Sequence, residues 1–370
     1  MKKQLISAAT MLLLLAGCAT TKNTKPATGG NLKNVNFEIL LGWAKKGSTD
    51  AQAALAQRYL SGTGVEKDEA KAFEWMEKAA NQGSAEAMHR LAKLYSDGLG
   101  VEKSQIRMVQ WIRKAANKGH PRAMNEFGRC YVKGVGGLEK SELLARQWIR
   151  KSAEKGEPQG MLNLAKMFQD GTGGEKNVEE SAKWMTQAAE KGHIEAQHQL
   201  GHLYEDGTGV DRDPVKAFEW WLKAAEQGNN SSQGHVANCY DDGDGVEKNP
   251  AKAVFWTKKA AEAGYPIMQH ILGIRYLKGR DLEKDVEKSL IWLNKAAEQG
   301  SAKTQYELGT IFASDQYGMK NLQQAYFWFS LVNDKSAEAK KALSDVGIEI
   351  KPDEMLRALE MVNEFKEKNK

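Results

Sequence analysis

Two histidines one helical turn apart are the residues in this chain best spaced to bind a metal ion. His198 and His202 lie at positions i and i+4, so on a helix both imidazole rings can point to the same side. Such a pair can bind zinc or copper, and His235 and His270 are expected on nearby structural units. No carboxylate or thiol is predicted to complete the ligand set. The sequence therefore predicts neither a metal site nor a cofactor, although weak metal binding stays open as an alternative.

Other residues capable of chemistry give no catalytic pattern. Cys130 and Cys239 each precede a tyrosine, and we expect them to be partly buried structural thiols that lie too far apart for a disulfide. Ser141 and Ser152 are not expected to act as nucleophiles. Recurrent Gly-x-Gly turns are not followed by a Lys-Ser/Thr pair, so they are not phosphate loops. We expect no enzymatic activity.

The chain begins with a predicted export signal, and the helices that position these residues follow it. Residues 1–18 comprise Lys2 and Lys3, an apolar run and the tetrapeptide ending in Cys18, a pattern typical of a secretory signal peptide and too short for a membrane span. The tetrapeptide Leu15-Ala16-Gly17-Cys18 resembles the lipobox of bacterial lipoproteins, which implies acylation of Cys18. In bacterial lipoproteins, an aspartate directly after the acylated cysteine resembles an inner-membrane retention signal. Ala19 stands there in this chain, which implies sorting to the outer membrane if the source has two membranes. A plain secretory leader is the alternative.

Residues 19–35 are rich in Thr, Lys, Asn and Gly and cannot bury enough apolar surface to fold alone. They are predicted to be a flexible tether. Residues 36–47 are predicted to form an N-terminal capping helix, and residues 337–370 to form C-terminal capping helices.

A core aromatic residue recurs at intervals of about 36 residues, which is the signature of a repeat protein. Each repeat is predicted to contain two helices joined by a Gly-x-Gly turn, with small residues on both facing sides. The second helix starts at a residue that can cap it through a side-chain oxygen. The periodic tryptophans are Trp75, Trp111, Trp148, Trp184, Trp220, Trp256, Trp292 and Trp328, and the capping residues are Asp68, Ser104, Ser141, Asn177, Asp213, Asn249, Asp285 and Asn321.

This unit resembles the Sel-one-like repeat, a relative of the tetratricopeptide repeat. The fifth unit matches nearly throughout, including Leu200, Gly201, Tyr204 and Trp220. The resemblance covers residues 48–336 as eight repeats, the eighth degenerate. It implies an all-α fold, a right-handed superhelical solenoid of helix-turn-helix repeats of about 36 residues, in which the tryptophans fill the space between neighbouring helix pairs.

The resemblance also implies a scaffold or adaptor that binds another protein in the bacterial envelope. The concave side of such a solenoid presents one row of side chains from the first helices, whose identity packing does not determine. The candidate groove residues are His89, Lys93, Asn125, Arg129, Lys166, His198, His202, Asn238, His270 and Tyr306. An ordinary solvated face is the alternative.

The amino-acid composition limits the classes of molecule that the protein is expected to bind. The chain is 41% hydrophobic and 27% charged with a formal net charge of +5, a balance that fits a folded helical protein and is too mild to indicate nucleic acid. We therefore expect a monomer that binds a protein or peptide and is attached to the membrane, facing the periplasm or the exterior, through the lipid on Cys18. The alternatives are a secreted host-interaction factor and a metal- or β-lactam-binding enzyme relative.

Overall fold

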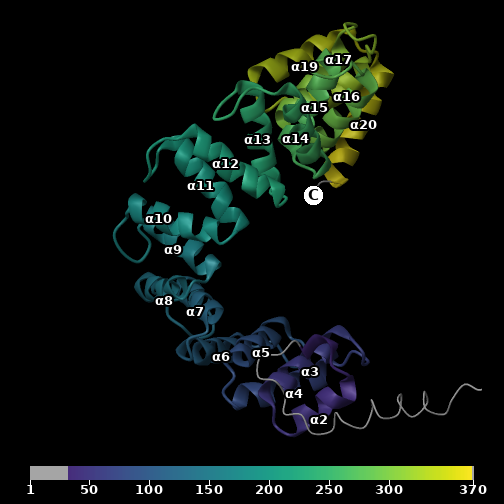
Figure 1. Ribbon diagram of the computed structural model, residues 1–370. Helices are drawn as coiled ribbons and strands as arrows, with labels where there is room; N and C mark the ends of the chain where they lie inside the picture. The colour runs from purple at the N-terminus through teal and green to yellow at the C-terminus, as the bar shows by residue number, and fades with distance from the viewer. Residues whose placement is uncertain (1–31, 369–370) are drawn as a thin grey trace, which may run out of the picture. The chain divides into compact units, whose positions relative to one another are not determined.

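The computed structural model describes residues 32–368, and over this range every regular element is a helix. Successive helices lie beside one another as pairs (Figure 1). The all-α repeat fold predicted from the sequence is confirmed. The chain divides into two compact units at Lys176–Asn177. The predicted signal peptide, Cys18 and most of the predicted tether lie outside the described residues.

The first unit contains a capping segment and three and a half helix pairs. Its elements are η1 (Leu32–Asn34), α2 (Phe37–Lys45), α3 (Thr49–Ser61), α4 (Glu69–Asn81), α5 (Ala85–Asp97), α6 (Gln105–Asn117), α7 (Pro121–Lys133), α8 (Glu142–Glu154) and α9 (Pro158–Asp170). We call the odd-numbered helices from α3 to α17 first helices and the even-numbered helices from α4 to α18 second helices.

The second unit continues the same alternation and ends in two further helices. Its elements are α10 (Val178–Glu190), α11 (Ile194–Asp206), α12 (Pro214–Glu226), α13 (Asn230–Asp242), α14 (Pro250–Glu262), α15 (Pro266–Lys278), α16 (Val286–Glu298), α17 (Ala302–Ala313), α18 (Leu322–Ser330), α19 (Ala337–Glu349) and α20 (Pro352–Lys368).

The predicted caps of the second helices are confirmed. Asp68 Oδ1, for example, accepts a hydrogen bond of 2.9 Å from the backbone N–H of Lys71, which satisfies one of the free donors of the first turn. All eight predicted residues cap their helices in this way. Each second helix therefore starts at a position that its own sequence specifies.

Small residues let the helices of each unit approach closely. Most second helices have an alanine pair near the end that is almost completely inaccessible, as at Ala79–Ala80 and Ala224–Ala225, which are 0% exposed. These residues pack against the following first helix, where Ala87 and Val236 are likewise 0% exposed. The two units thus have contiguous apolar cores built from one repeated contact.

The periodic tryptophans are less buried than their spacing predicts. Trp111, Trp256 and Trp328 are buried, but Trp75, Trp184 and Trp220 are only half-buried. In most repeats, a lysine three residues later covers the outer face of the ring, as Lys114 does 3.8 Å from the centroid of Trp111. A cation–π contact of this kind is a stabilising interaction with the ring. The half-buried rings still pack against the apolar clusters, as Trp75 and Trp292 do, but part of each ring stays accessible to solvent.

The fully buried position is the residue that follows each tryptophan. Met76, Met185 and Leu293 are at most 1% exposed. Because helical neighbours point about 100° apart, the tryptophan and its successor cannot both face the core centre.

The turn of the seventh repeat has an aspartate in place of its second glycine. Gly100 has a φ of 70°, and a Cβ there would lie 1.9 Å from the Glu69 carbonyl oxygen. The corresponding residue of the seventh repeat is Asp281, which keeps a positive φ of 59°. Its carboxylate accepts a 2.9 Å hydrogen bond from buried Arg275, which also pairs with Asp241. This ion pairing stabilises an aspartate in a conformation that favours glycine.

Both ends of the described chain are covered by helices outside the repeats. Leu40 and Ala44 of α2 are buried against α3. At the other end, Ala358 and Val362 of α20 pack in one cluster with Phe327 and Trp328 of α18. These helices shield apolar surface that the terminal repeats would expose.

A buried glutamine joins successive repeats of the second unit. Gln197 Nε2 donates to the Ala189 carbonyl at 3.0 Å, and its Oε1 accepts from Gln227 Nε2 at 2.7 Å. The equivalent Gln233 donates to Ala225 at 3.2 Å, but its Oε1 is buried without a hydrogen-bond partner. The reason is that Ala263 stands where the preceding repeat has Gln227.

Ala263→Gln should therefore stabilise the second unit. The new amide can donate to Gln233 Oε1 and satisfy an orphaned buried acceptor, which is worth about 1 kcal/mol. Ala263→Met, of similar size but without a donor, is the matched control. Urea denaturation should show a higher midpoint for Ala263→Gln alone; equal midpoints for the two variants would contradict the assigned role of Gln233.

Candidate functional site

The predicted groove row is made of paired positions, one turn apart, on successive first helices. The first member of each pair is buried or half-buried, as at Asn125, His198 and His270, whereas the second is mostly exposed, as at Lys93 and Arg129. The exposed members can contact a partner, and the buried members hold neighbouring first helices together.

Hydrogen bonds show what the buried members do. Asn125 Oδ1 accepts from Asn163 Nδ2 at 2.7 Å. His198 Nδ1 lies 2.8 Å from Ser232 Oγ, and His270 Nδ1 lies 3.1 Å from Thr304 Oγ1. Each contact joins one first helix to the first helix of the next repeat.

The exposed members carry a run of positive charge in the first unit. Lys93 on α5, Arg129 on α7 and Lys166 on α9 occupy equivalent positions and are all exposed. Beside Arg129 lies a cavity of about 290 Å³, lined also by Met108 and Ile112 of α6. In the second unit the equivalent positions hold half-buried His202, exposed Asn238 and exposed Thr310. Tyr306, the last predicted groove residue, is half-buried and packs its ring on Phe329.

Histidines of this row face carboxylates in two repeats. His89 Nε2 lies 3.0 Å from Glu126 Oε1, and His270 Nε2 lies 3.2 Å from Glu307 Oε2. The third histidine at this position, His198, faces His235, which occupies the position of Glu126 and Glu307 in the following repeat. A second imidazole thus stands where the other two histidines have an acidic partner.

His198, His202 and His235 form one cluster, with one possible ligand atom from each lying within 4.8 Å of the others. His202 Nδ1 lies 3.1 Å from Glu205 Oε2, and the His235 ring stacks on Trp221 at 4.4 Å. Burial lowers the pKa of His198, and burial together with its two histidine neighbours lowers the pKa of His235 to about 4. His270, expected nearby, is bonded instead to Thr304 and faces Glu307.

Glu86, His89 and His120 form a second cluster, on α5 and at the start of α7. His120 Nδ1 accepts from the N–H of Ala123, so its Nε2 carries the proton and donates to Glu86 at 2.8 Å. Arg90 donates to the other Glu86 oxygen at 2.5 Å. The hydrogen bonds from His120 and Arg90 lower the pKa of Glu86 to about 2. This cluster is an ion-pair network with its polar atoms already matched.

The two described cysteines are structural. Cys130 and Cys239 are both buried and free, and burial raises the pKa of Cys130 to about 11 and that of Cys239 to about 12. Because the thiolate is the reactive form, neither is suited to nucleophilic chemistry.

Ser152 and Lys155 have the Ser-x-x-Lys spacing of some acyl-transfer enzymes, which the sequence reasoning overlooked. The Ser152 hydroxyl is inaccessible and donates to the Pro121 carbonyl at 2.7 Å, whereas Lys155 is exposed at the helix end. A serine buried in a helix–helix contact cannot reach a substrate.

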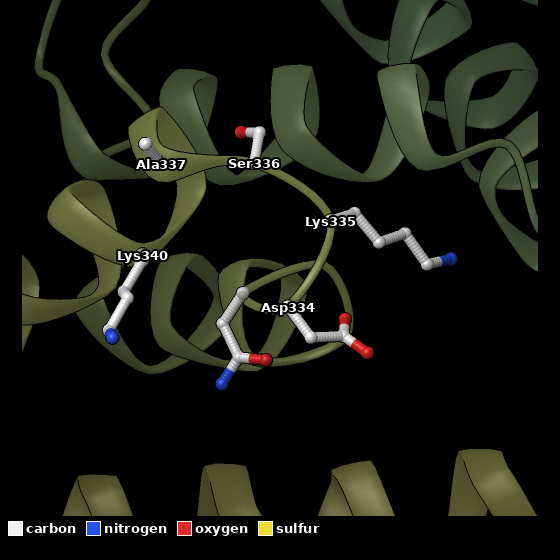
Figure 2. Close-up of a pocket in the computed structure, with 6 residues that line it drawn as sticks. Asp334, Lys335, Ser336, Ala337 and Lys340 are labelled. Carbon is white, nitrogen blue, oxygen red and sulfur yellow. The ribbon is translucent and has the colours of Figure 1, made fainter.

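A hollow of about 510 Å³ lies at the turn between α18 and α19 and is lined by residues 333–337 and Lys340. Figure 2 shows Asp334, Lys335 and Lys340 pointing apart. Ser336 is engaged as the cap of α19. The exposed, diverging side chains provide no convergent set of ligands for a small molecule.

A family model described as the Sel1 repeat matches residues 49–84, 85–120, 121–157, 158–193, 194–229, 231–265, 266–301 and 302–331. The chain belongs to the Sel1 repeat family. The eight matches correspond to the first and second helices from α3 to α18. Sel1 repeat proteins generally bind proteins, and their fold is typically a non-catalytic scaffold.

Two solved structures of Sel1 repeat proteins are similar to this chain. One is c5321, a protective antigen present in uropathogenic Escherichia coli strains, with 30% identity, a TM-score of 0.52, and coverage of 90% of this chain and 79% of that chain. The other is a Sel1 repeat protein from Oxalobacter formigenes, with 30% identity, a TM-score of 0.56, and coverage of 66% and 96%. Comparison with curated proteins gives no match.

Within this Sel1 repeat protein, the histidine cluster should make stability sensitive to acid. Folded His235 has a pKa of about 4 against an ordinary value of 6.5, so between these values the unfolded chain binds a proton that the folded chain does not. Unfolding therefore becomes easier as the pH falls. His235→Phe, which retains an aromatic ring beside Trp221, should remove up to about 3 kcal/mol of this pH dependence.

The measurement is the unfolding free energy by urea titration from pH 7 to pH 4, in the presence of a chelator. Wild type and His235→Phe should diverge in slope between about pH 6.5 and 4. Parallel curves would show that His235 titrates alike in the folded and unfolded chains.

Proposed function

We propose that this Sel1 repeat protein is a non-catalytic adaptor of the bacterial envelope that binds an acidic segment of another protein along its first helices. The observation that carries the proposal is the row of Lys93, Arg129 and Lys166, exposed at equivalent positions of α5, α7 and α9. Exposed side chains at equivalent positions of successive first helices are the surface that repeat proteins use for recognition.

The spacing of this row suits an extended partner. Adjacent first helices are in direct contact, since His89 of α5 faces Glu126 of α7 and Asn163 of α9 donates to Asn125 of α7. Their basic side chains therefore lie one helix apart, and acidic side chains of a partner segment can meet them in succession. The cavity beside Arg129 is lined by both polar and apolar residues, and its Met108 and Ile112 side chains can contact one apolar side chain of the same segment.

Charge reversal tests the row. Lys93→Glu with Arg129→Glu should abolish recovery of the partner in crosslinking and pull-down from cells, because like charges then face the acidic segment. The matched control is Arg107→Glu with Arg113→Glu, which makes the same change in net charge at two exposed positions of α6. If only the control variant loses the partner, or if both variants still recover it, the first-helix row is not the binding surface.

We also propose that the chain is anchored to the outer membrane by a lipid on Cys18. The motif Leu15-Ala16-Gly17-Cys18 supports this, and the similar Escherichia coli protein is a protective antigen, a property that favours an exported protein. Among the described residues no helix is long and apolar enough to cross a membrane.

Cys18→Ala should abolish incorporation of a labelled fatty acid and release the protein from the membrane fraction. Cys130→Ala, which removes a buried thiol from the folded repeats, is the control and should keep the label. Labelling that survives Cys18→Ala would mean that the chain is exported without this lipid.

A further inference from the structure

Three imidazoles converge where α11 and α13 lie beside each other. The ring of His202 is nearly perpendicular to those of His198 and His235, with centroids 4.8 Å and 4.7 Å away, and the centroids of His198 and His235 are 5.7 Å apart. One possible ligand atom from each ring lies within 4.8 Å of the other two. The rings thus enclose a common point.

The cluster retains lone pairs that no protein group uses. His202 Nδ1–H donates to the Glu205 carboxylate, which leaves Nε2 with a lone pair. His198 has its described hydrogen bond at Nδ1, to Ser232. His235 forms no hydrogen bond with any residue in the described range, although it is less than half exposed. A carboxylate or hydroxyl on the remote nitrogen of a histidine is the usual support of a metal ligand.

The rest of the chain shows that this arrangement is specific to one place. In two other repeats, the histidine equivalent to His198 faces a glutamate, at the pairs His89–Glu126 and His270–Glu307. In the cluster of Glu86, His89 and His120, the ring nitrogens of His120 are both bonded. Among the described residues, the cluster containing His235 is the one group of possible metal ligands made of three imidazoles. The other group contains two imidazoles and the carboxylate of Glu86.

Trp221 holds the third ring in place. Its indole stacks on His235 with an interplanar angle of 13° and meets the His202 ring edge-on at 5.3 Å. Gly201 makes room for it, because a Cβ there would lie 2.3 Å from Trp221 Nε1. Trp221 stands at the position that Met76 or Met185 occupies in other repeats. The indole thus covers one face of His235 and lies against the His202 ring.

We propose that His198, His202 and His235 bind a divalent transition metal ion, with Zn²⁺ as the probe. Neutral imidazole is a preferred ligand of Zn²⁺, with Zn–N bonds of about 2.0–2.1 Å. In a tetrahedral zinc site with bonds of that length, the ligand nitrogens are about 3.3 Å apart. The three rings must therefore turn so that each ligand nitrogen moves by about 1 Å toward the common point. Three histidines leave the fourth position for water or a donor from a bound molecule. This site is independent of the proposed partner row, which lies on α5, α7 and α9.

The test is calorimetric titration of ZnCl₂ into full-length protein that carries no histidine tag and has been stripped with a chelator. We expect one ion per chain in wild type and at least tenfold weaker binding in His202→Gln and in His235→Phe. His89→Gln in the other cluster is the matched control and should bind as wild type does. Circular dichroism of each variant verifies that its helices are intact.

Cobalt substitution gives a second readout. Co²⁺ bound by three imidazoles and water should show the intense visible absorption of a tetrahedral complex, which disappears in His202→Gln. Because copper generally binds such sites more tightly than zinc, Cu²⁺ binding that also requires His202 and His235 supports the proposal. Absence of binding by both Zn²⁺ and Cu²⁺, or binding that persists in both histidine variants, would overturn it.

Discussion

The close contact between each second helix and the next first helix is the interaction on which the rest of this structure depends. Alanine pairs such as Ala224–Ala225 are fully buried there, and no larger side chain could occupy those positions without forcing the helices apart. Because every repeat makes the same contact, the first helices of a unit are brought side by side. A row of recognition residues and a histidine cluster can exist only because of that stacking.

Polar groups buried at the same interfaces specify the register of the stack. The glutamine that donates to the end of the preceding second helix recurs at Gln197, Gln233, Gln269 and Gln305. Its oxygen needs a donor, which Gln227 and Gln299 at the end of the same repeat provide for Gln197 and Gln269. Burying an amide is costly unless it is bonded, so a displaced repeat would lose the bond to the preceding helix. Packing brings the repeats together, and these bonds select one alignment.

The variation among repeats carries the functional information. The pairs of residues that meet between neighbouring first helices differ from repeat to repeat, from the neutral pair Asn125–Asn163 to the histidine–glutamate pair His89–Glu126. At His198 the pair consists of two histidines, and a third, His202, follows one turn later. The fold accommodates His235 at this position because the Trp221 ring packs on the His235 ring. A repeat array can thus acquire a local site while each of its backbone contacts stays the same.

The sequence alone determined the helices, their limits and their repetition. Period, capping residues and turn glycines are local signals, and local hydrogen bonding decides them, as at Asp68 and Asn249. The sequence also indicated the row of first-helix side chains and singled out His198 and His202. These inferences needed only spacing along one helix.

Only the tertiary structure decided which periodic residues are buried and which side chains meet between repeats. Trp184 remains half-buried while Met185 is inaccessible, because the packing of a helix against its neighbours selects which of its positions is central. His235 joins His198 while His270 pairs with Glu307, because each first helix packs beside the first helix of the next repeat. Side chains more than thirty residues apart come together only through the packing of whole helices, and no local pattern records their distance.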